Sequence, residues 1–119
     1  MTRVLVADDS STMRKIILRS LQAVGVNDIT EASDGSEALA IFKPGEFDMV
    51  LTDWNMPGLT GLDVLQGIRA QDAAIPVIMV TTEAEKTRVL QAIQAGVSDY
   101  LVKPFTADTL REKLEKHGC

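Results

Sequence analysis

Five residues with charged or hydroxyl side chains stand directly after short apolar stretches of the chain: Asp8, Asp9, Asp53, Thr81 and Lys103. Each apolar stretch has the length of a buried strand, and the polar residues come at the point where such a strand would end. When the strands of a sheet are parallel, their carboxyl ends meet at one edge, and ligands bind beyond that edge. We therefore expect these side chains to converge on a single site.

The three carboxylates of this group, on Asp8, Asp9 and Asp53, would repel each other at one edge of a sheet. At a separation of about 4 Å and an effective dielectric near 20, one pair of like charges costs about 4 kcal/mol. A cation is therefore expected among them. A ligand set made only of oxygen, with no His or Cys nearby, favours a hard divalent ion, and Mg²⁺ is the ion that we expect.

Lys103 adds a fixed positive charge to the predicted site, and Thr81 adds a hydroxyl group. A divalent ion, a lysine and a hydroxyl around one carboxylate form surroundings suited to phosphoryl oxygens. Asp53 would then be a nucleophile that forms an aspartyl phosphate. Taken singly, the residues have simpler explanations, because adjacent aspartates before a helix are favoured by the helix dipole. Their joint position at strand ends favours a site.

The hydrophobic pattern alternates between strand and helix along the chain. Short apolar runs predict strands at residues 3–7, 28–32, 49–52, 77–80 and 100–102. Apolar residues at helical spacing predict helices over 13–24, 38–42, 62–68 and 83–95, and a last helix that carries Leu110 and Leu114. Thr106 or Asp108 is expected to cap this last helix. Five strand-then-helix units with short connections predict a doubly wound α/β fold with a parallel sheet.

Composition places the chain among folded proteins of one domain. It has 119 residues, 45% of them hydrophobic, and we expect a single domain over residues 1–119. The net charge of −5 argues against a nucleic-acid-binding surface. A single cysteine excludes a disulfide framework, and no apolar run approaches the ~20 residues that span a membrane. Without a signal-peptide pattern at the start, a cytoplasmic protein with no membrane contact is expected.

The order and spacing of Asp8-Asp9, Asp53, Thr81 and Lys103-Pro104 resemble those of the receiver domain of two-component response regulators. The stretches DDSSTMRK, DWNMPGLTGLDVL and QAGVSDYLVKPFTADTL extend the resemblance over the chain, and they look most like the stand-alone receivers of chemotaxis. The resemblance implies a flavodoxin-like sheet of five parallel strands in the order 2-1-3-4-5, with five helices. It also implies a signalling switch that catalyses only its own phosphorylation and dephosphorylation, and not an enzyme with a separate substrate.

The resemblance assigns roles in metal binding and phosphorylation. Asp9 and Asp53 would ligate Mg²⁺ directly, and Asp8 would act through a bound water. Asn55 would offer its backbone carbonyl to the metal. Asp53 would receive the phosphoryl group from a histidine kinase.

The resemblance also implies a switch and an output surface. Lys103 and Thr81 would contact phosphoryl oxygens, and Tyr100 would be an aromatic side chain that rotates with the switch. The fourth helix, fifth strand and fifth helix would form the partner face, with Lys113 in its binding part. The expected partner is a downstream protein, with a flagellar motor switch as the leading candidate, and the chain itself is expected to be a monomer.

Two neighbours of the site are expected to modulate the lifetime of the phosphoryl group. Thr82 follows the switch threonine, where the chemotaxis receivers have a smaller residue, and a larger side chain can shield the phosphoryl group from water. Glu83 and Asn55 match the neighbours of the chemotaxis type.

Other functions fit parts of the pattern. A phosphorelay intermediate, or the receiver portion of a larger regulator, would share every site residue. A phosphatase working through an aspartyl phosphate would need a second Asp two positions after the nucleophile, whereas Asn55 cannot exchange a proton at neutral pH. A flavin or nucleotide module is disfavoured because the first strand-helix turn, ADDSSTMRK, has two carboxylates and no glycine-rich loop.

The remaining distinctive residues are interpreted as structural. We expect Trp54 to be a partly exposed neighbour of the site, and the Lys103-Pro104 peptide to be a candidate for the cis form. No role is assigned to His117 or Cys119. Packing is the interpretation for four methionines, namely Met13, Met49, Met56 and Met79.

Overall fold

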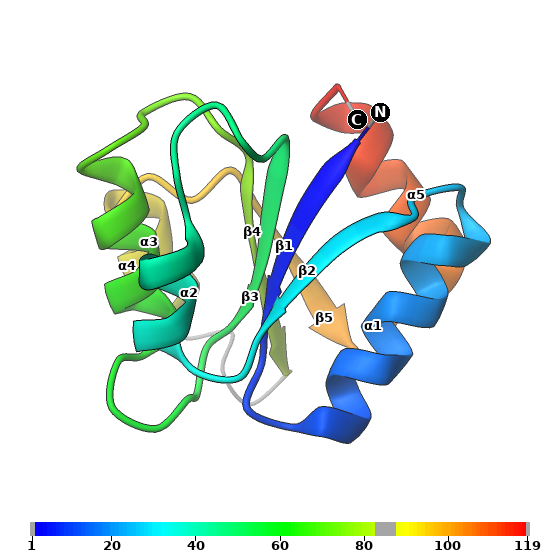
Figure 1. Ribbon diagram of the computed structural model, residues 1–119, viewed down its shortest axis with the longest axis horizontal. Helices are drawn as coiled ribbons and strands as arrows, with labels where there is room; N and C mark the ends of the chain where they lie inside the picture. The colour runs from blue at the N-terminus through cyan, green and yellow to red at the C-terminus, as the bar shows by residue number, and fades with distance from the viewer. Residues whose placement is uncertain (1, 83–87, 119) are drawn as a thin grey trace.

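The computed structural model of the chain describes residues 2–82 and 88–118. Within these residues five strands form one sheet, namely β1 (Arg3–Ala7), β2 (Asp28–Ala32), β3 (Met49–Asp53), β4 (Val77–Thr82) and β5 (Asp99–Lys103) (Figure 1). All five were predicted, and β3, β4 and β5 extend one or two residues further. The extensions arise because the parallel ladder continues into polar residues, pairing Thr82 with Lys103 in register.

The helices of the described residues are α1 (Ser11–Ala23), α2 (Gly35–Ile41), α3 (Gly61–Arg69), α4 (Val89–Gln94) and α5 (Ala107–Lys116). Four of them start behind a side chain that accepts a hydrogen bond from the backbone N–H three residues on, namely Ser10, Asp34, Thr60 and Thr106. Such caps satisfy N–H groups that the first helical turn leaves open. The first part of the helix predicted over 83–95, including Glu83, falls outside the described residues.

The sheet is parallel throughout and has the strand order β2-β1-β3-β4-β5, as predicted. Helices α1 and α5 cover one face, and α2, α3 and α4 cover the other (Figure 1). The three inner strands β1, β3 and β4 are buried apart from Arg3 and Thr82, which fits strands covered on both faces. The outer strands β2 and β5 are only partly buried. The fold class predicted from the sequence is therefore confirmed.

Two apolar cores lie on the two faces of the sheet. Alternate residues of β1 point to opposite faces, so that Leu5 belongs to one core and Val4 to the other. The core under α2 and α3 includes Leu65 and Ile68, and the core under α1 and α5 includes Leu21. Across residues 2–82 and 88–118, none of the helices combines the length and apolar character needed to cross a membrane.

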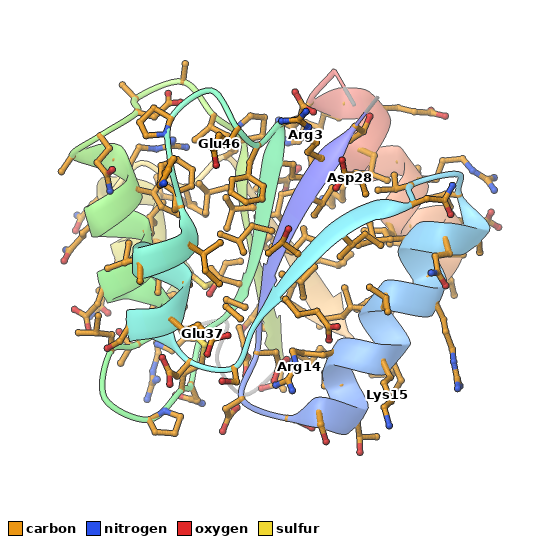
Figure 2. All side chains as sticks on the ribbon, in the orientation of Figure 1. Arg3, Arg14, Lys15, Asp28, Glu37 and Glu46 are labelled. Atoms are coloured by element: carbon orange, nitrogen blue, oxygen red, sulfur yellow. The ribbon has the colours of Figure 1, made fainter. Side chains whose placement is uncertain are left out.

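The two ends of the sheet differ in their chemistry. Figure 2 shows Arg3, Asp28 and Glu46 at the end where β1 starts, where Arg3 Nε lies 3.6 Å from Asp28 Oδ2. Arg14 lies at the opposite end, where the strands finish, and its Nη1 donates a 2.6 Å hydrogen bond to the carbonyl oxygen of Asp8 (Figure 2). This bond ties α1 to the end of β1 and so to the edge where the predicted site residues gather.

Candidate functional site

Three carboxylates come together where β1 and β3 end. Asp8 and Asp9 follow β1, Asp53 is the last residue of β3, and one oxygen from each lies within 4.8 Å of the others. Asp8 and Asp53 are buried, with Asp53 only 7% exposed, whereas Asp9 faces solvent. The edge is therefore an acidic pocket with one side open to water.

Lys103 reaches this pocket from the end of β5. Its Nζ lies 3.1 Å from Oδ1 of Asp53 and 3.5 Å from Oδ2 of Asp8. The peptide between Lys103 and Pro104 is cis, as anticipated. One ammonium group thus serves two buried carboxylates.

The proton affinity of Asp53 reflects this crowding. Burial and the charge of Asp8 raise the pKa of Asp53, against the opposing effect of the hydrogen bonds that it accepts from Lys103 and the Trp54 N–H. The net effect is a raised pKa, so that Lys103 alone does not offset the cost of an ionised Asp53 in this place. A further positive charge at the site would lower that cost.

Asp8 carries an oxygen suited to a metal ion. Its Oδ1 accepts a hydrogen bond from the Ser10 N–H. Its buried Oδ2 has no hydrogen-bond partner within the described residues and lies 3.5 Å from the Lys103 ammonium, which it shares with Asp53. Buried oxygens of this kind are costly unless they find a donor or a cation. The oxygen-only donors of Asp8, Asp9 and Asp53 fit Mg²⁺ in kind and in charge.

Thr81 and Asn55 lie at the same edge as the carboxylates. Thr81 is buried near the end of β4, one residue beyond Val80, which pairs in register with Asp53. Asn55 is exposed, two residues after Asp53, and its Oδ1 accepts a 3.1 Å hydrogen bond from Nη1 of Arg88. Thr82 is half-buried at the end of β4.

Gly61 allows α3 to begin directly against the end of β3. Its N–H donates a 2.7 Å hydrogen bond to the carbonyl oxygen of Trp54. A Cβ atom at Gly61 would lie 2.1 Å from the carbonyl oxygen of Asp53, much closer than real Cβ contacts allow. The close approach fixes the backbone that carries Asp53 and Trp54.

Tyr100 and Lys113 lie together on β5 and α5. The Tyr100 ring is exposed, and Lys113 Nζ lies 5.5 Å from its centroid, within cation-π range. The same Nζ lies 3.0 Å from Oδ1 of Asp99 at the start of β5. Tyr100 and Lys113 line a groove of about 250 Å³ between β5 and α5.

Sequence reasoning missed the ion-pair cluster around Asp99. This buried carboxylate contacts Lys113, Lys116 and His117 at 3.0, 3.4 and 3.1 Å. Burial raises the pKa of Asp99, but hydrogen bonds from Lys113, His117 and the Tyr100 N–H outweigh it and lower the pKa to about 2. The spacing of the three basic residues, which places them on one face of α5, is the signal that could have revealed the cluster.

The prediction that Trp54 is partly exposed is wrong. Its side chain is 4% exposed and belongs to the same buried core as Met56 and Val64. The guanidinium of Arg88 lies over the ring, with its Cζ 5.8 Å from the ring centroid. Met49, Met56 and Met79 are buried and Met13 packs against the core, in agreement with the packing interpretation.

Comparison with known proteins places the chain in a family. A sequence model described as "Response regulator receiver domain" matches residues 4–115. The chain belongs to the response regulator receiver family. This receiver domain is 51% identical over 116 residues to Chemotaxis protein CheY-3 of Vibrio cholerae, covering 96% of this chain and 89% of that protein. It is 49% identical over 116 residues to Chemotaxis protein CheY of Pseudomonas aeruginosa, covering 96% of this chain and 94% of that protein.

Solved structures share the fold of this receiver domain. A response regulator receiver domain protein from Clostridium thermocellum superposes with a TM-score of 0.91 at 33% identity, covering 98% of this chain and 94% of that one. Chemotaxis response regulator CheY4 of Vibrio cholerae superposes with a TM-score of 0.87 at 34% identity, covering 98% of both chains.

Proposed function

We propose that this receiver domain is a phosphorylation switch of a chemotaxis pathway, acting in the cytoplasm as a monomer. Asp53 accepts a phosphoryl group from a histidine kinase in a Mg²⁺-dependent reaction, and the phosphorylated chain binds a downstream protein. The observation that carries the proposal is the position of Asp53, buried, bonded to Lys103, and within reach of two further carboxylates. The similarity to CheY proteins of chemotaxis supports the choice of pathway.

The proposed metal ligands are Asp9 and Asp53 directly, Asp8 through a water molecule, and the backbone carbonyl of Asn55. When bound, Mg²⁺ supplies positive charge that stabilises the phosphoryl oxygens during transfer. The buried Oδ2 of Asp8 supports a further cation in this place, because it has no hydrogen-bond partner among the described residues and shares the Lys103 ammonium with Asp53.

Transfer requires little of the protein beyond position and charge. A carboxylate oxygen of Asp53 forms a bond to phosphorus while the phosphorus–nitrogen bond of the phosphohistidine breaks, and the imidazole leaves with the bonding electrons. Lys103 pairs with one phosphoryl oxygen, and the Thr81 hydroxyl donates a hydrogen bond to another. Thr82 and Glu83 are proposed to set how fast water later removes the group.

The output is a population shift on the face made by α4, β5 and α5. Contacts of the phosphoryl group with Thr81 and Lys103 exist only in the active arrangement, so they favour it by their free energy. The face presents Leu90 at 64% exposure and Ile93 at 59%, together with Tyr100. Exposed apolar side chains in one area are typical of a protein-binding surface.

Lys113 completes the proposed partner face. It stands beside Tyr100 at the groove between β5 and α5, where a cation can pair with an acidic partner. A segment of the flagellar motor switch is the leading candidate for this partner. A phosphorelay intermediate or the receiver portion of a larger regulator would use the same site with another partner.

The decisive experiment measures acid-labile phosphate on the chain after incubation with acetyl phosphate and Mg²⁺. The wild type is expected to gain one phosphoryl group, and Asp53→Asn to gain none. Asp28→Asn is the matched control, because it makes the same change at the opposite end of the sheet (Figure 2). Equal labelling of Asp53→Asn and wild type would overturn the proposal, as would steady release of phosphate from a small phosphoester.

A further inference from the structure

Arg88 makes two contacts that none of the roles above uses. Its Nη1 donates a 3.1 Å hydrogen bond to Oδ1 of Asn55, and its Cζ lies 5.8 Å from the centroid of the Trp54 ring. Trp54 and Asn55 immediately follow Asp53 in the chain. The side chain of Arg88 therefore contacts the first two residues of the loop that follows Asp53, the proposed phosphorylation site.

The backbone of Arg88 lies directly before the first residue of α4. Helix α4 has six residues, and Arg88, its N-cap residue, makes no side-chain capping bond. Of the α4 side chains that are described, only that of Ala92 is buried. An element whose described side chains bury so little surface moves at low cost in free energy. A single contact with the loop after Asp53 can therefore influence its position.

The chemistry of the guanidinium group suits an exchange of partners. It is always charged, it is planar, and it can lie on an aromatic ring while it donates hydrogen bonds. Its present acceptor is the neutral amide of Asn55. A phosphoryl group on Asp53 would replace the single carboxylate charge with one of about −1.5 to −2, two residues from Asn55, and would carry it on oxygens that reach further from the strand. A charged acceptor binds a guanidinium more strongly than an amide does.

We propose that Arg88 is a positioning residue that links the charge on Asp53 to the position of α4. Without a phosphoryl group, Arg88 holds the start of α4 to Asn55 and Trp54. With one, the guanidinium is drawn away from Asn55, and the first turn of α4 moves with it. The moving turn leads into Leu90 and Ile93, the exposed apolar residues of the helix. This inference rests on the proposed function, since it needs a phosphorylated Asp53.

The test follows hydrogen exchange of the α4 amides, at residues 89–94, in the full chain with Mg²⁺, with and without excess acetyl phosphate. The intact mass of each sample gives the phosphorylated fraction. In the wild type we expect exchange in α4 to change on phosphorylation. In Arg88→Gln and Arg88→Lys, we expect phosphorylation to persist while the change in α4 exchange falls by about twofold or more. Lysine is expected to fail as a substitute because it lacks the planar fork.

Two further variants separate this inference from simpler explanations. Arg19→Gln removes the same charge from an exposed site on α1 and is expected to retain the full α4 response. Asn55→Ala removes the acceptor but keeps the backbone carbonyl, so adding Arg88→Gln to it should change the α4 response little further.

The outcomes distinguish the inference from the function beneath it. A full α4 response in phosphorylated Arg88→Gln, or additive effects of Arg88→Gln and Asn55→Ala, would overturn the inference and leave the phosphorylation switch intact. Absence of phosphate on the wild type would overturn the proposed function itself. A reduced α4 response confined to the Arg88 and Asn55 variants would support the link.

Discussion

The ammonium group of Lys103 lies 3.1 Å from the carboxylate of Asp53, although fifty residues separate the two in the chain. The same group is 3.5 Å from Asp8, which makes it a shared cation for two buried acids. The contact crosses β4, which lies between β3 and β5 in the sheet. The ion pair therefore depends on the complete assembly of the central and edge strands.

Replacing this lysine should destabilise the chain. We expect Lys103→Gln to lower the free energy of unfolding by about 1–3 kcal/mol near pH 7, because it leaves two buried carboxylates without their cation. Urea unfolding with and without Mg²⁺ measures the effect. Magnesium should stabilise Lys103→Gln more than wild type, since its charge takes the place of the lost one. An equal gain from Mg²⁺ in both proteins would contradict this explanation.

Removing the charge of Asp53 should have the opposite effect. Folding raises the pKa of Asp53, mainly through burial. The folded chain therefore binds a proton at Asp53 more tightly than the unfolded chain does. As the pH rises through the folded pKa, the ionised carboxylate lowers the free energy of unfolding. Without metal, Asp53→Asn is expected to gain about 1 kcal/mol near pH 7. The gain should shrink as the pH falls towards the unfolded pKa of 3.8. Urea titrations at several pH values test this, and a gain independent of pH would argue against it.

Asp99 should show the reverse pH dependence. Burial raises the pKa of Asp99, but hydrogen bonding outweighs this effect and lowers the pKa from 3.8 to about 2. The ionised Asp99 therefore stabilises the fold fully above the unfolded pKa, and this stabilisation is lost as the pH falls through the folded pKa. Asp99→Asn is expected to cost about 2 kcal/mol near pH 7, and less between pH 4 and pH 2. Asp108→Asn, an exposed acid paired with Arg111, serves as control and should change little.

Gly61 has no room for a side chain. Gly61→Ala would force its Cβ against the carbonyl oxygen of Asp53 and the sulfur of Met79, so we expect a loss of about 2 kcal/mol or more and slower phosphorylation. Thermal unfolding and the rate of labelling by acetyl phosphate measure the two effects. Gly67→Ala, in the same helix, meets only the flexible end of Leu39 and should be milder.

Thr82 is expected to protect the phosphoryl group from water. Thr82→Ala should shorten its lifetime several-fold, because the smaller side chain opens the half-buried end of β4. The loss of label after removal of acetyl phosphate gives the rate. Thr109→Ala, a matched change on α5, is the control, and an unchanged lifetime in Thr82→Ala would remove this role.

The sequence predicted the convergence of Asp8, Asp53 and Lys103 because the ends of parallel strands share an edge, whatever their separation in the chain. The burial of Trp54 was not predictable in the same way. It depends on the packing of Trp54 into one core with Val64 and Leu65 of α3, which is a tertiary relation without a local signal.

Two cationic contacts also escaped prediction. In the sequence Arg88 looks like an ordinary residue inside the helix predicted over 83–95, and only the fold brings it against Trp54 and Asn55. His117, near the chain end, was assigned no role, but α5 packs so that its ring meets Asp99 at 3.1 Å. Helical periodicity places Lys113, Lys116 and His117 on one face of α5, but it does not show that this face contacts Asp99 of β5.

The strand order leaves β2 and β5 as the two outer strands of an open sheet. An outer strand presents unpaired backbone groups that can join the sheet of another molecule, and charged side chains hinder such joining. β5 carries Asp99 at one end and Lys103 at the other, while β2 carries Asp28 and Glu31. On β5, the charges that build the site and anchor α5 therefore also hinder edge-to-edge aggregation, while Asp28 and Glu31 have this effect on β2.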